Sequence, residues 1–445
     1  MAILILLTVL LLSEFSHSKY KRWINPITIF VVPHSLSILL LLGANFIDGN
    51  LSSRTFLIFF SSIILYCLGT EIGAGVDKSF RKDKKKIKII KPIKVQIKPF
   101  LFVASIVIDI IIVLYIREIQ QNYGIINAIL NLSKYNQYLQ QEGAGSGYSV
   151  LVFLAMPFSL ILQVCIRYVQ EIKENTLLKI VLMIQFVVCF IPFISARRNT
   201  IVFLAILNLL LYYLSSTRKL IHNYKRILLG AGVIYFILLF FSKTQQMMNK
   251  STSIIMTCYG VTVPKALVDI FGYLAGNYKY FDLVMQQGLP KVDAPLIATL
   301  RVPYIYIGGL FKSTVNTTDA FALRLMQIGD NGVAYHFNTI PIQYYLMLDS
   351  VYLFPFEMIM MGAITSKMYK KTMSDPTISN LSLCAFQFAV VFMSFREYDL
   401  IFLSSIVTLF ILLFLKKISF TRGIYSLTNI NVKKMQLFSK QIPRI

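Results

Sequence analysis

The chain has 445 residues, of which 56% are hydrophobic and only 14% charged, and its formal net charge is +24. Soluble globular domains carry roughly a quarter charged residues, so this composition excludes one. The mean hydropathy of +0.66 and continuous apolar runs of about 17 to 25 residues, unlike the short alternating segments of a β-barrel, predict an all-α polytopic membrane protein.

Eleven membrane spans are predicted in chain order. The first lacks a basic n-region and an A-x-A-like cleavage site, so we interpret it as a retained span rather than a signal peptide. Four of the five cysteines fall inside apolar runs, and their spacing matches neither a disulfide framework nor a zinc site. The spans lie near residues 2–16, 24–44, 55–72, 99–116, 148–168, 178–195, 200–216, 227–243, 341–366, 377–395 and 399–415.

Lysine and arginine are distributed unevenly between the loops, which predicts the orientation. The segment 78–98 holds ten basic residues and is expected in the cytoplasm, against anionic headgroups. Alternation from there places the N-terminus outside and the C-terminus in the cytoplasm. Six regions then lie inside and hold 30 of the 44 basic residues: 18–23, 78–98, 167–179, 217–226, 367–371 and 416–445. Topology therefore accounts for the positive charge, and no nucleic-acid partner is needed.

This topology divides the chain into four regions. Residues 1–242 form an N-terminal transmembrane bundle with the basic cytoplasmic loop at 73–98, and 243–340 form a large outer segment. Residues 341–415 form the C-terminal transmembrane helices, and 416–445 a basic cytoplasmic tail. The outer segment is semi-apolar and interrupted by proline and glycine, which is typical of interfacial helices or short re-entrant pieces.

Arginines on the outer side run against the charge rule and are candidates for binding an anion. Two are adjacent in "SARRNT", between two spans, and another occupies the corner "FMSFREYDL". A guanidinium group is always charged and binds phosphate or pyrophosphate through two hydrogen bonds. Headgroup anchoring or pairing with a carboxylate is the alternative. The outer set is Arg197, Arg198, Arg301, Arg324 and Arg396.

Candidate acids and bases lie in the same half of the chain. His336 is the only histidine of the outer segment and could accept a proton from a hydroxyl group; an ordinary hydrogen-bonded histidine is the alternative. Glu357, Glu397 and Asp399 are further candidate bases, among which the sequence does not choose.

Two carboxylates, Asp109 and Asp349, fall within predicted spans, where a charge is costly and usually faces a polar cavity or a partner. Asn338, Tyr345, Asp349 and Tyr352 have spacings that place them on one helix face. This face is expected to be either one wall of an outward-open cleft, or a packing stripe in which Asp349 pairs with an arginine.

Several motifs are absent. The sequence has no P-loop, no HExxH, no GxSxG and no GxGxxG at a strand–helix junction, which disfavours ATP-driven transport and metalloprotease activity. No D-x-D pair occurs in the outer segment, which disfavours a metal-bound nucleotide sugar.

Two stretches and the overall layout resemble the Wzy-type oligosaccharide repeat-unit polymerases, the O-antigen or capsule polymerases of bacterial surface polysaccharide assembly. "SARRNTIVFLAI" is similar to the short arginine-bearing turn of that family. "YHFNTIPIQYYLMLDSVYLFPFEMIMMGAI" resembles its F/Y-N-T element followed by a span with tyrosine and aspartate. Where the family often shows Asp-Phe-Gly after the tyrosines, this chain reads "LDSVYLF". The eleven-span layout with basic inner loops also resembles the family.

The resemblance implies a membrane glycosyltransferase of lipopolysaccharide or capsule biosynthesis, with a GT-C-like fold, in the bacterial inner membrane. On the periplasmic face, such an enzyme transfers a glycan from undecaprenyl pyrophosphate onto another lipid-linked repeat unit, without nucleotide, metal or other cofactor. Its implied partners are undecaprenyl-pyrophosphate-linked oligosaccharide, membrane lipids and a chain-length regulator protein.

Site roles follow from this implied reaction. Arg197 and Arg198, and then Arg301, Arg324 and Arg396, would hold the leaving pyrophosphate. Other side chains would act as catalytic acid or base (His336, Asp349, Glu397) or contact the glycan (Asn338, Tyr345, Tyr352). Alternatives are an O-antigen ligase, which uses the same leaving group, a lipid-linked oligosaccharide flippase, and an ion or solute transporter. The hundred-residue outer segment argues against a flippase.

Overall fold

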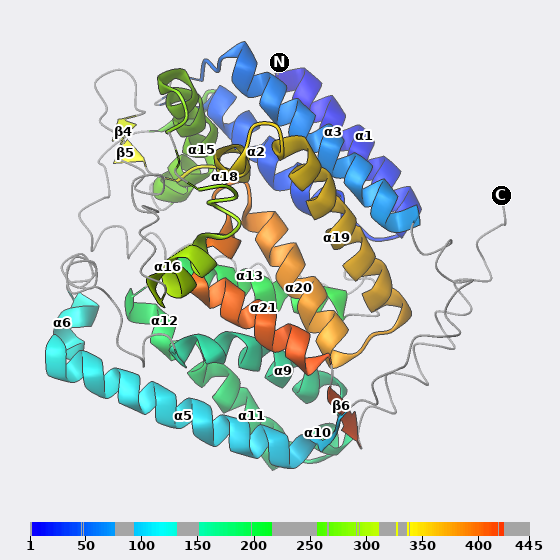
Figure 1. The fold of residues 1–445 in the computed structure, drawn as a ribbon, viewed down its shortest axis with the longest axis vertical. Helices are drawn as coiled ribbons and strands as arrows, with labels where there is room; N and C mark the ends of the chain where they lie inside the picture. Colours follow the sequence, from blue (N-terminus) through cyan, green and yellow to red (C-terminus); the bar gives the residue numbers. More distant parts are fainter. Residues whose placement is uncertain are drawn as a thin grey trace. The chain divides into compact units, whose positions relative to one another are not determined.

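The computed structural model describes most of the chain, and helices dominate it (Figure 1). Among the described residues, four helices are long and apolar enough to cross a membrane, and five shorter apolar helices coincide with further predicted spans. The expectation of a helical membrane protein is thus confirmed at this level. The described residues are 2–45, 47, 49–75, 93–130, 151–196, 198–215, 256–264, 267–290, 292, 294–310, 326–327, 336–337, 339–416 and 418–421.

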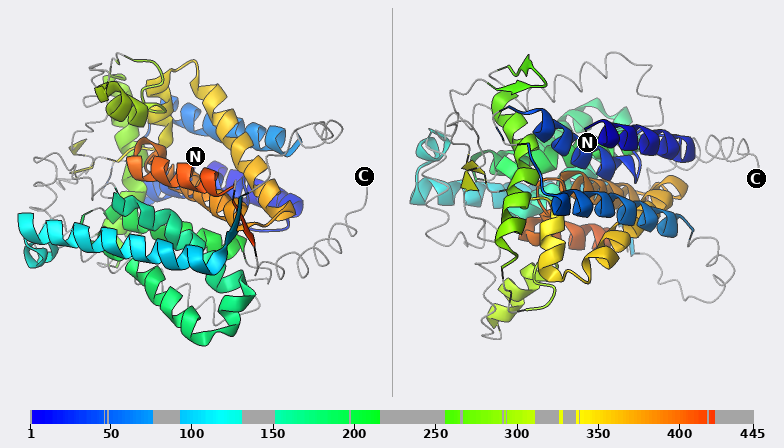
Figure 2. Two further views of the ribbon diagram at one scale, coloured as in Figure 1. Left: turned by 60° about the horizontal axis from the view of Figure 1, so that its bottom comes forward. Right: turned by 90° about the horizontal axis from the view of Figure 1, so that it is seen from above.

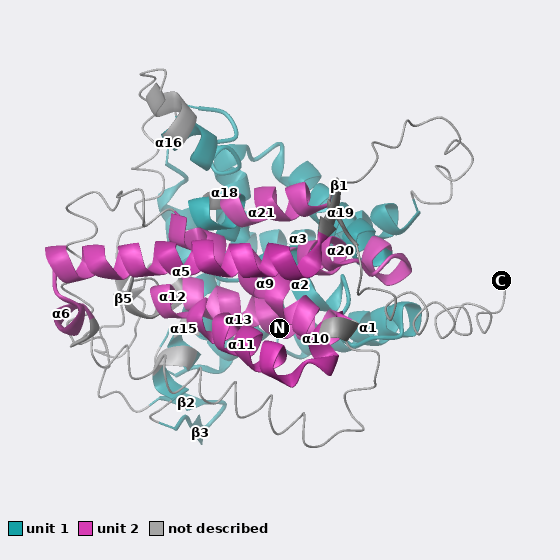
Figure 3. Ribbon diagram, turned by 90° about the horizontal axis from the view of Figure 1, so that it is seen from below, with its two compact units in different colours: residues 1–85, 235–370, 387–406 teal, residues 86–234, 371–386, 407–445 magenta. Residues whose placement is uncertain are grey.

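The chain divides into two compact units, each assembled from three separate stretches (Figure 3). Unit 1 comprises residues 1–85, 235–370 and 387–406, and unit 2 comprises residues 86–234, 371–386 and 407–445. Unit 1 contains α1 (Ala2–Tyr20), α2 (Thr28–Gly43), α3 (Ser53–Gly75), β2 (Thr257–Cys258), β3 (Val261–Thr262), α15 (Val268–Gln287), α16 (Arg301–Leu310), β4 (Met326–Gln327), β5 (His336–Phe337), α18 (Ile342–Asp349), most of α19 (Phe354–Ser374), the end of α20 (Ile378–Met393) and the 3-10 turn Asp399–Ile401.

Unit 2 contains two of the four long apolar helices in the described part of the chain. It comprises β1 (Ile93–Gln96), α5 (Ile97–Asn122), α6 (Ile125–Leu130), a 3-10 turn (Val152–Leu154), α9 (Ala155–Tyr168), α10 (Gln170–Glu174), α11 (Thr176–Val188), α12 (Ile191–Ala196), α13 (Arg198–Leu214), most of α21 (Leu403–Leu415) and β6 (Ile418–Thr421). Asp109 on α5 accepts a hydrogen bond from Gln185 on α11 at 2.7 Å. The predicted need of this carboxylate for a partner is therefore confirmed.

Two strands of unit 2 join distant parts of the chain. β1 and β6 form a parallel pair, with Ile93 opposite Ile418 and Gln96 opposite Thr421. The residues immediately before α5 and those just after α21 are thus tied together through their backbones.

Helices α3 and α19 of unit 1 cross in close contact through glycines. A methyl group added at Gly69 or Gly73 would overlap the carbonyl oxygen of Ile359 or Ala363, and one added at Gly362 would overlap that of Tyr66. Small residues let helix backbones approach in this way without bulky side chains between them. Because the pairs rise together along both helices, α3 and α19 run parallel.

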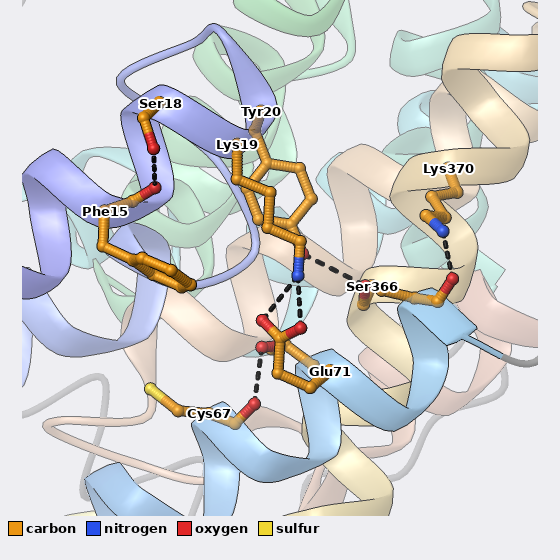
Figure 4. A network of polar contacts seen from close by, with 10 residues as sticks. Phe15, Ser18, Lys19, Tyr20, Cys67, Glu71, Ser366 and Lys370 are labelled. Carbon is orange, nitrogen blue, oxygen red and sulfur yellow. Dashed lines mark hydrogen bonds and ion pairs between the residues drawn. The ribbon is translucent and has the colours of Figure 1, made fainter. Parts of the chain in front are cut away.

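The C-terminal ends of α1, α3 and α19 meet in a polar network (Figure 4). Lys19 on α1 forms an ion pair with Glu71 on α3 at 2.5 Å. Tyr20 lies 3.4 Å from the hydroxyl of Ser366, and the Lys370 ammonium donates to the carbonyl oxygen of Ala74. These contacts hold the three helix ends at one level of unit 1.

Helix α15 packs against α2 and crosses the direction of α3, as the view from above shows for α3 (Figure 2). The ring of Tyr278 lies 5.7 Å from that of Phe59 on α3, and its hydroxyl lies 2.6 Å from His34 on α2. Asp282 on the same helix accepts hydrogen bonds from Ser52 and Thr55 at the start of α3. This buried crossing helix belongs to the predicted outer segment.

The span predicted at 341–366 is wrong as a continuous helix. α18 ends at Asp349, Ser350 is extended, and α19 begins at Phe354. Pro355 explains the break, because proline lacks the N–H that a continuous helix needs and restricts the residue before it. Its place in the first turn of α19 is one that proline tolerates.

Candidate functional site

A group of polar side chains, most of them buried, lies in unit 1, and we call it the polar cluster. Three segments supply it: the turn before α16, the break between α18 and α19, and the connection after α20. Its members are Thr299, Arg301, Tyr345, Asp349, Glu357, Arg396, Glu397, Tyr398 and Asp399.

Two tyrosines link the three segments. The rings of Tyr345 and Tyr398 lie 6.4 Å apart. Tyr345 lies close enough to Glu397 and Arg301 to interact with their charges. Tyr398 lies close enough to interact with the carboxyl groups of Asp349 and Glu357. Both tyrosines are more than nine-tenths buried, so the polar cluster is one connected interior site.

Asp349 is an anchor for the turn that leads into α16. Its carboxylate accepts hydrogen bonds from the backbone N–H groups of Ala298 (2.5 Å) and Thr299 (3.0 Å) and from the Thr299 hydroxyl (2.6 Å). Neither of the two roles predicted for it, lining a cleft or pairing with an arginine, describes these contacts. Because Arg301 follows two residues later, the carboxylate fixes the point from which that arginine extends.

Glu357 lies in the first turn of α19, beside the middle part of the apolar helix α3. It precedes Gly362 by five residues, and Gly362 contacts Tyr66 and Thr70 on the parallel α3. With a rise of about 1.5 Å per residue, Glu357 is level with the middle of α3, which is long and apolar enough to cross a membrane. An ionisable group at such a depth marks a functional site by default.

Two carboxyl groups of the polar cluster each have one oxygen without a hydrogen bond in the part of the chain that the structure describes, although the Glu357 carboxyl group lies beside that of Asp349. Glu357 and Asp399 are 8% and 6% exposed, and the Oε2 of Glu357 and the Oδ2 of Asp399 make no hydrogen bond among the residues that the structure describes. Buried polar atoms are almost always satisfied. The polar cluster therefore has acceptor sites for a ligand or for water.

The two arginines share the polar cluster with acidic groups, and Arg396 lies near the Asp399 carboxyl group. Arg396 is 7% exposed, and Arg301 and Glu397 are half-buried. Four carboxylates and two guanidinium groups share the cluster, so it can bind hydroxyl groups through the acids and an oxyanion through the arginines.

The structure brings together seven of the residues considered for the site: Arg301, Tyr345, Asp349, Glu357, Arg396, Glu397 and Asp399. It separates Tyr352, which lies in the turn between α18 and α19 and is 94% exposed. The helix face predicted to hold Tyr345, Asp349 and Tyr352 is therefore wrong, because the helix ends at Asp349.

The remaining predicted residues are not among the described members of the polar cluster. Arg198 is the first residue of α13, in unit 2. His336 forms part of β5, where its backbone pairs with Gln327. Arg197, Arg324 and Asn338 lie outside the described residues.

Sequence reasoning gave no site role to Thr299, Tyr398 or His34. A signal existed for His34, which is an ionisable residue inside a predicted span next to two serines. Thr299 and Tyr398 carry no such signal, because tyrosine and threonine are common at membrane interfaces and only their tertiary contacts distinguish them.

A comparison with known protein families, curated proteins and solved structures finds no match for this chain.

Proposed function

We propose that this protein is a membrane glycosyltransferase that polymerises oligosaccharide repeat units carried on undecaprenyl pyrophosphate. The observation on which the proposal rests is the polar cluster, in which buried carboxylate oxygens that accept no hydrogen bond from the described residues lie near tyrosines and arginines. Sugar hydroxyls donate hydrogen bonds to such oxygens, and sugar rings stack on aromatic side chains.

The proposed reaction assigns a separate task to each kind of group. A hydroxyl oxygen of the acceptor sugar attacks the anomeric carbon of the donor, and the bond from that carbon to the pyrophosphate oxygen breaks. Glu397, the half-exposed acid of the polar cluster, takes the hydroxyl proton. Arg301 and Arg396 stabilise the negative charge that develops on the departing undecaprenyl pyrophosphate. Asp349 contributes indirectly, by holding the turn before Arg301.

The proposed topology has eleven spans and a GT-C-like arrangement in the bacterial inner membrane, with the N-terminus outside and the C-terminus in the cytoplasm. Three features support it. Alternation requires the spans of α3 and α19 to run in the same direction, as their glycine contacts do. The ends of α1, α3 and α19 that should be cytoplasmic meet one another. β1 and β6, both assigned to the cytoplasm, pair directly.

The testing experiment uses full-length protein reconstituted in vesicles with lipid-linked repeat units. The product is separated by size on a gel, with and without core lipid as an alternative acceptor. We expect a ladder of polymers from the native protein, and its loss in Glu397→Gln and Arg396→Gln. Tyr352→Ala is the matched control, because this exposed side chain lies in the adjacent turn, and it should give the native ladder.

The other outcomes distinguish the rival functions. Transfer of single units to core lipid, with no ladder, would identify a ligase. Passage of the lipid-linked unit across the vesicle membrane without any new glycosidic bond would identify a flippase. Either result would overturn the proposal, as would a native ladder from both cluster variants.

A further inference from the structure

A chain of four buried side chains crosses the interior of unit 1. His34 on α2 lies with Nδ1 2.6 Å from the Tyr278 hydroxyl on α15 and Nε2 2.8 Å from the Ser394 hydroxyl after α20. Gln343 on α18 donates from its amide nitrogen to the same tyrosine hydroxyl at 3.2 Å. All four residues are fully buried, so water does not compete for these bonds.

The hydrogen bonds of this chain run in one direction. The single hydroxyl hydrogen of Ser394 is used toward the carbonyl oxygen of Val391, at 2.6 Å. Ser394 must therefore accept from His34, which requires the hydrogen on Nε2. Nδ1 is then an acceptor, and Tyr278 donates to it. The geometry thus selects the Nε2–H tautomer of a neutral His34, which is flanked by the ring of Phe30 at 4.1 Å.

Ser394 is the residue through which this chain reaches the polar cluster. Its carbonyl oxygen accepts the backbone N–H of Ile342 at 2.8 Å, at the first residue of α18. α18 supplies Tyr345 and Asp349, and the connection that follows Ser394 supplies Arg396 and Glu397. One serine therefore sets the position of the two segments on which the polar cluster depends.

We propose that His34 is a positioning residue for the corner that holds Arg396 and Glu397. Through Ser394 it fixes this corner against α2 and α15, although it touches no substrate itself. This inference rests on the proposed function for its catalytic consequence, while the tautomer and the rigidity of the corner can be tested without it. A displacement of a reacting group by about 1 Å lowers turnover by up to a hundredfold.

Two variants separate positioning from packing. His34→Gln preserves the chain, because its Oε1 can accept from Tyr278 and its Nε2 can donate to Ser394. His34→Phe fills a similar volume but makes neither bond. In the polymer assay, we expect His34→Phe to lower kcat by roughly ten- to a hundredfold with KM changed less than about twofold, and His34→Gln to restore at least half of the native kcat. Equal kcat values for native protein and His34→Phe would overturn the proposal.

Tyr278→Phe is the second test, because it removes only one hydroxyl and keeps the ring that packs against Phe59. It should fold, and it should lower kcat in the same direction as His34→Phe. A native kcat in this variant, with native thermal stability, would show that the chain does not position the corner.

Two readouts do not depend on activity. Nitrogen-15 spectra of histidine-labelled full-length protein should show His34, assigned by its loss in His34→Gln, as the Nε2–H tautomer. Hydrogen exchange of backbone amides 394–402 should be faster in His34→Phe than in His34→Gln. The Nδ1–H tautomer, or equal exchange in the two variants, would refute the positioning role even if the native protein polymerises. Conversely, the expected spectra with no polymer from the native protein would refute only the proposed function.

Discussion

Replacing Asp349 tests whether this carboxylate anchors the turn before α16 or acts on substrate. In Asp349→Ala, two backbone N–H groups and the Thr299 hydroxyl lose their acceptor. A buried donor left without an acceptor costs roughly 1–3 kcal/mol. Since Thr299 is reached by water, we take the low end for each donor and expect the free energy of unfolding to fall by about 3 kcal/mol. Asp349→Asn keeps one carbonyl oxygen and should lose about half as much.

The assay is unfolding of the purified protein by titration with SDS in mixed micelles. Tyr352→Ala serves as the control and should stay within about 0.5 kcal/mol of the native protein, because its side chain is exposed. Limited proteolysis with trypsin gives a local readout, and cleavage after Arg301 should be faster in Asp349→Ala. If Asp349→Ala unfolds like the native protein, resists trypsin equally and yet makes no polymer, the carboxylate acts on substrate and the anchoring argument is refuted.

The remaining predictions concern packing and orientation. Gly69→Ala should lower the yield of folded protein severely, because the added methyl group overlaps the carbonyl oxygen of Ile359. Gly75→Ala is the control and should leave the yield unchanged, because a methyl group there meets no atom within 4 Å. Equal yields from the two variants would contradict the close crossing of α3 and α19. In the proposed topology, a cysteine at Val261 should react with a membrane-impermeant maleimide in intact cells, and a cysteine at Ser374 only after the cells are opened; labelling of both in intact cells would contradict the orientation.

Apolar periodicity predicted the helices because burial in lipid makes a long uninterrupted run almost diagnostic. It failed at 341–366, since hydropathy does not detect that Ser350 is extended or that Pro355 must begin a new helix. The sequence nevertheless indicates the break, because Pro355 lies within the predicted span and proline interrupts a continuous helix.

The polar cluster was predictable only in part. Residue type and position identified Arg301, Arg396 and Glu397 as unusual, because charged groups near apolar runs are rare. The anchoring of Asp349 by the N–H groups of Ala298 and Thr299 could not be predicted, since it depends on a turn about fifty residues away in sequence. Every residue except proline has a backbone N–H group, so the identity of a residue does not show whether its backbone will donate to a buried carboxylate.

The parallel pairing of β1 with β6 has a consequence for biosynthesis. The two strands are separated by more than three hundred residues, so β1 emerges from the ribosome long before its partner exists. The segment before α5 can form this pairing only after α21 and the β6 strand that follows it have been synthesised. Unit 2 therefore reaches its native form only after β6 has been synthesised, and a truncation just after α21 would leave β1 permanently without its partner strand.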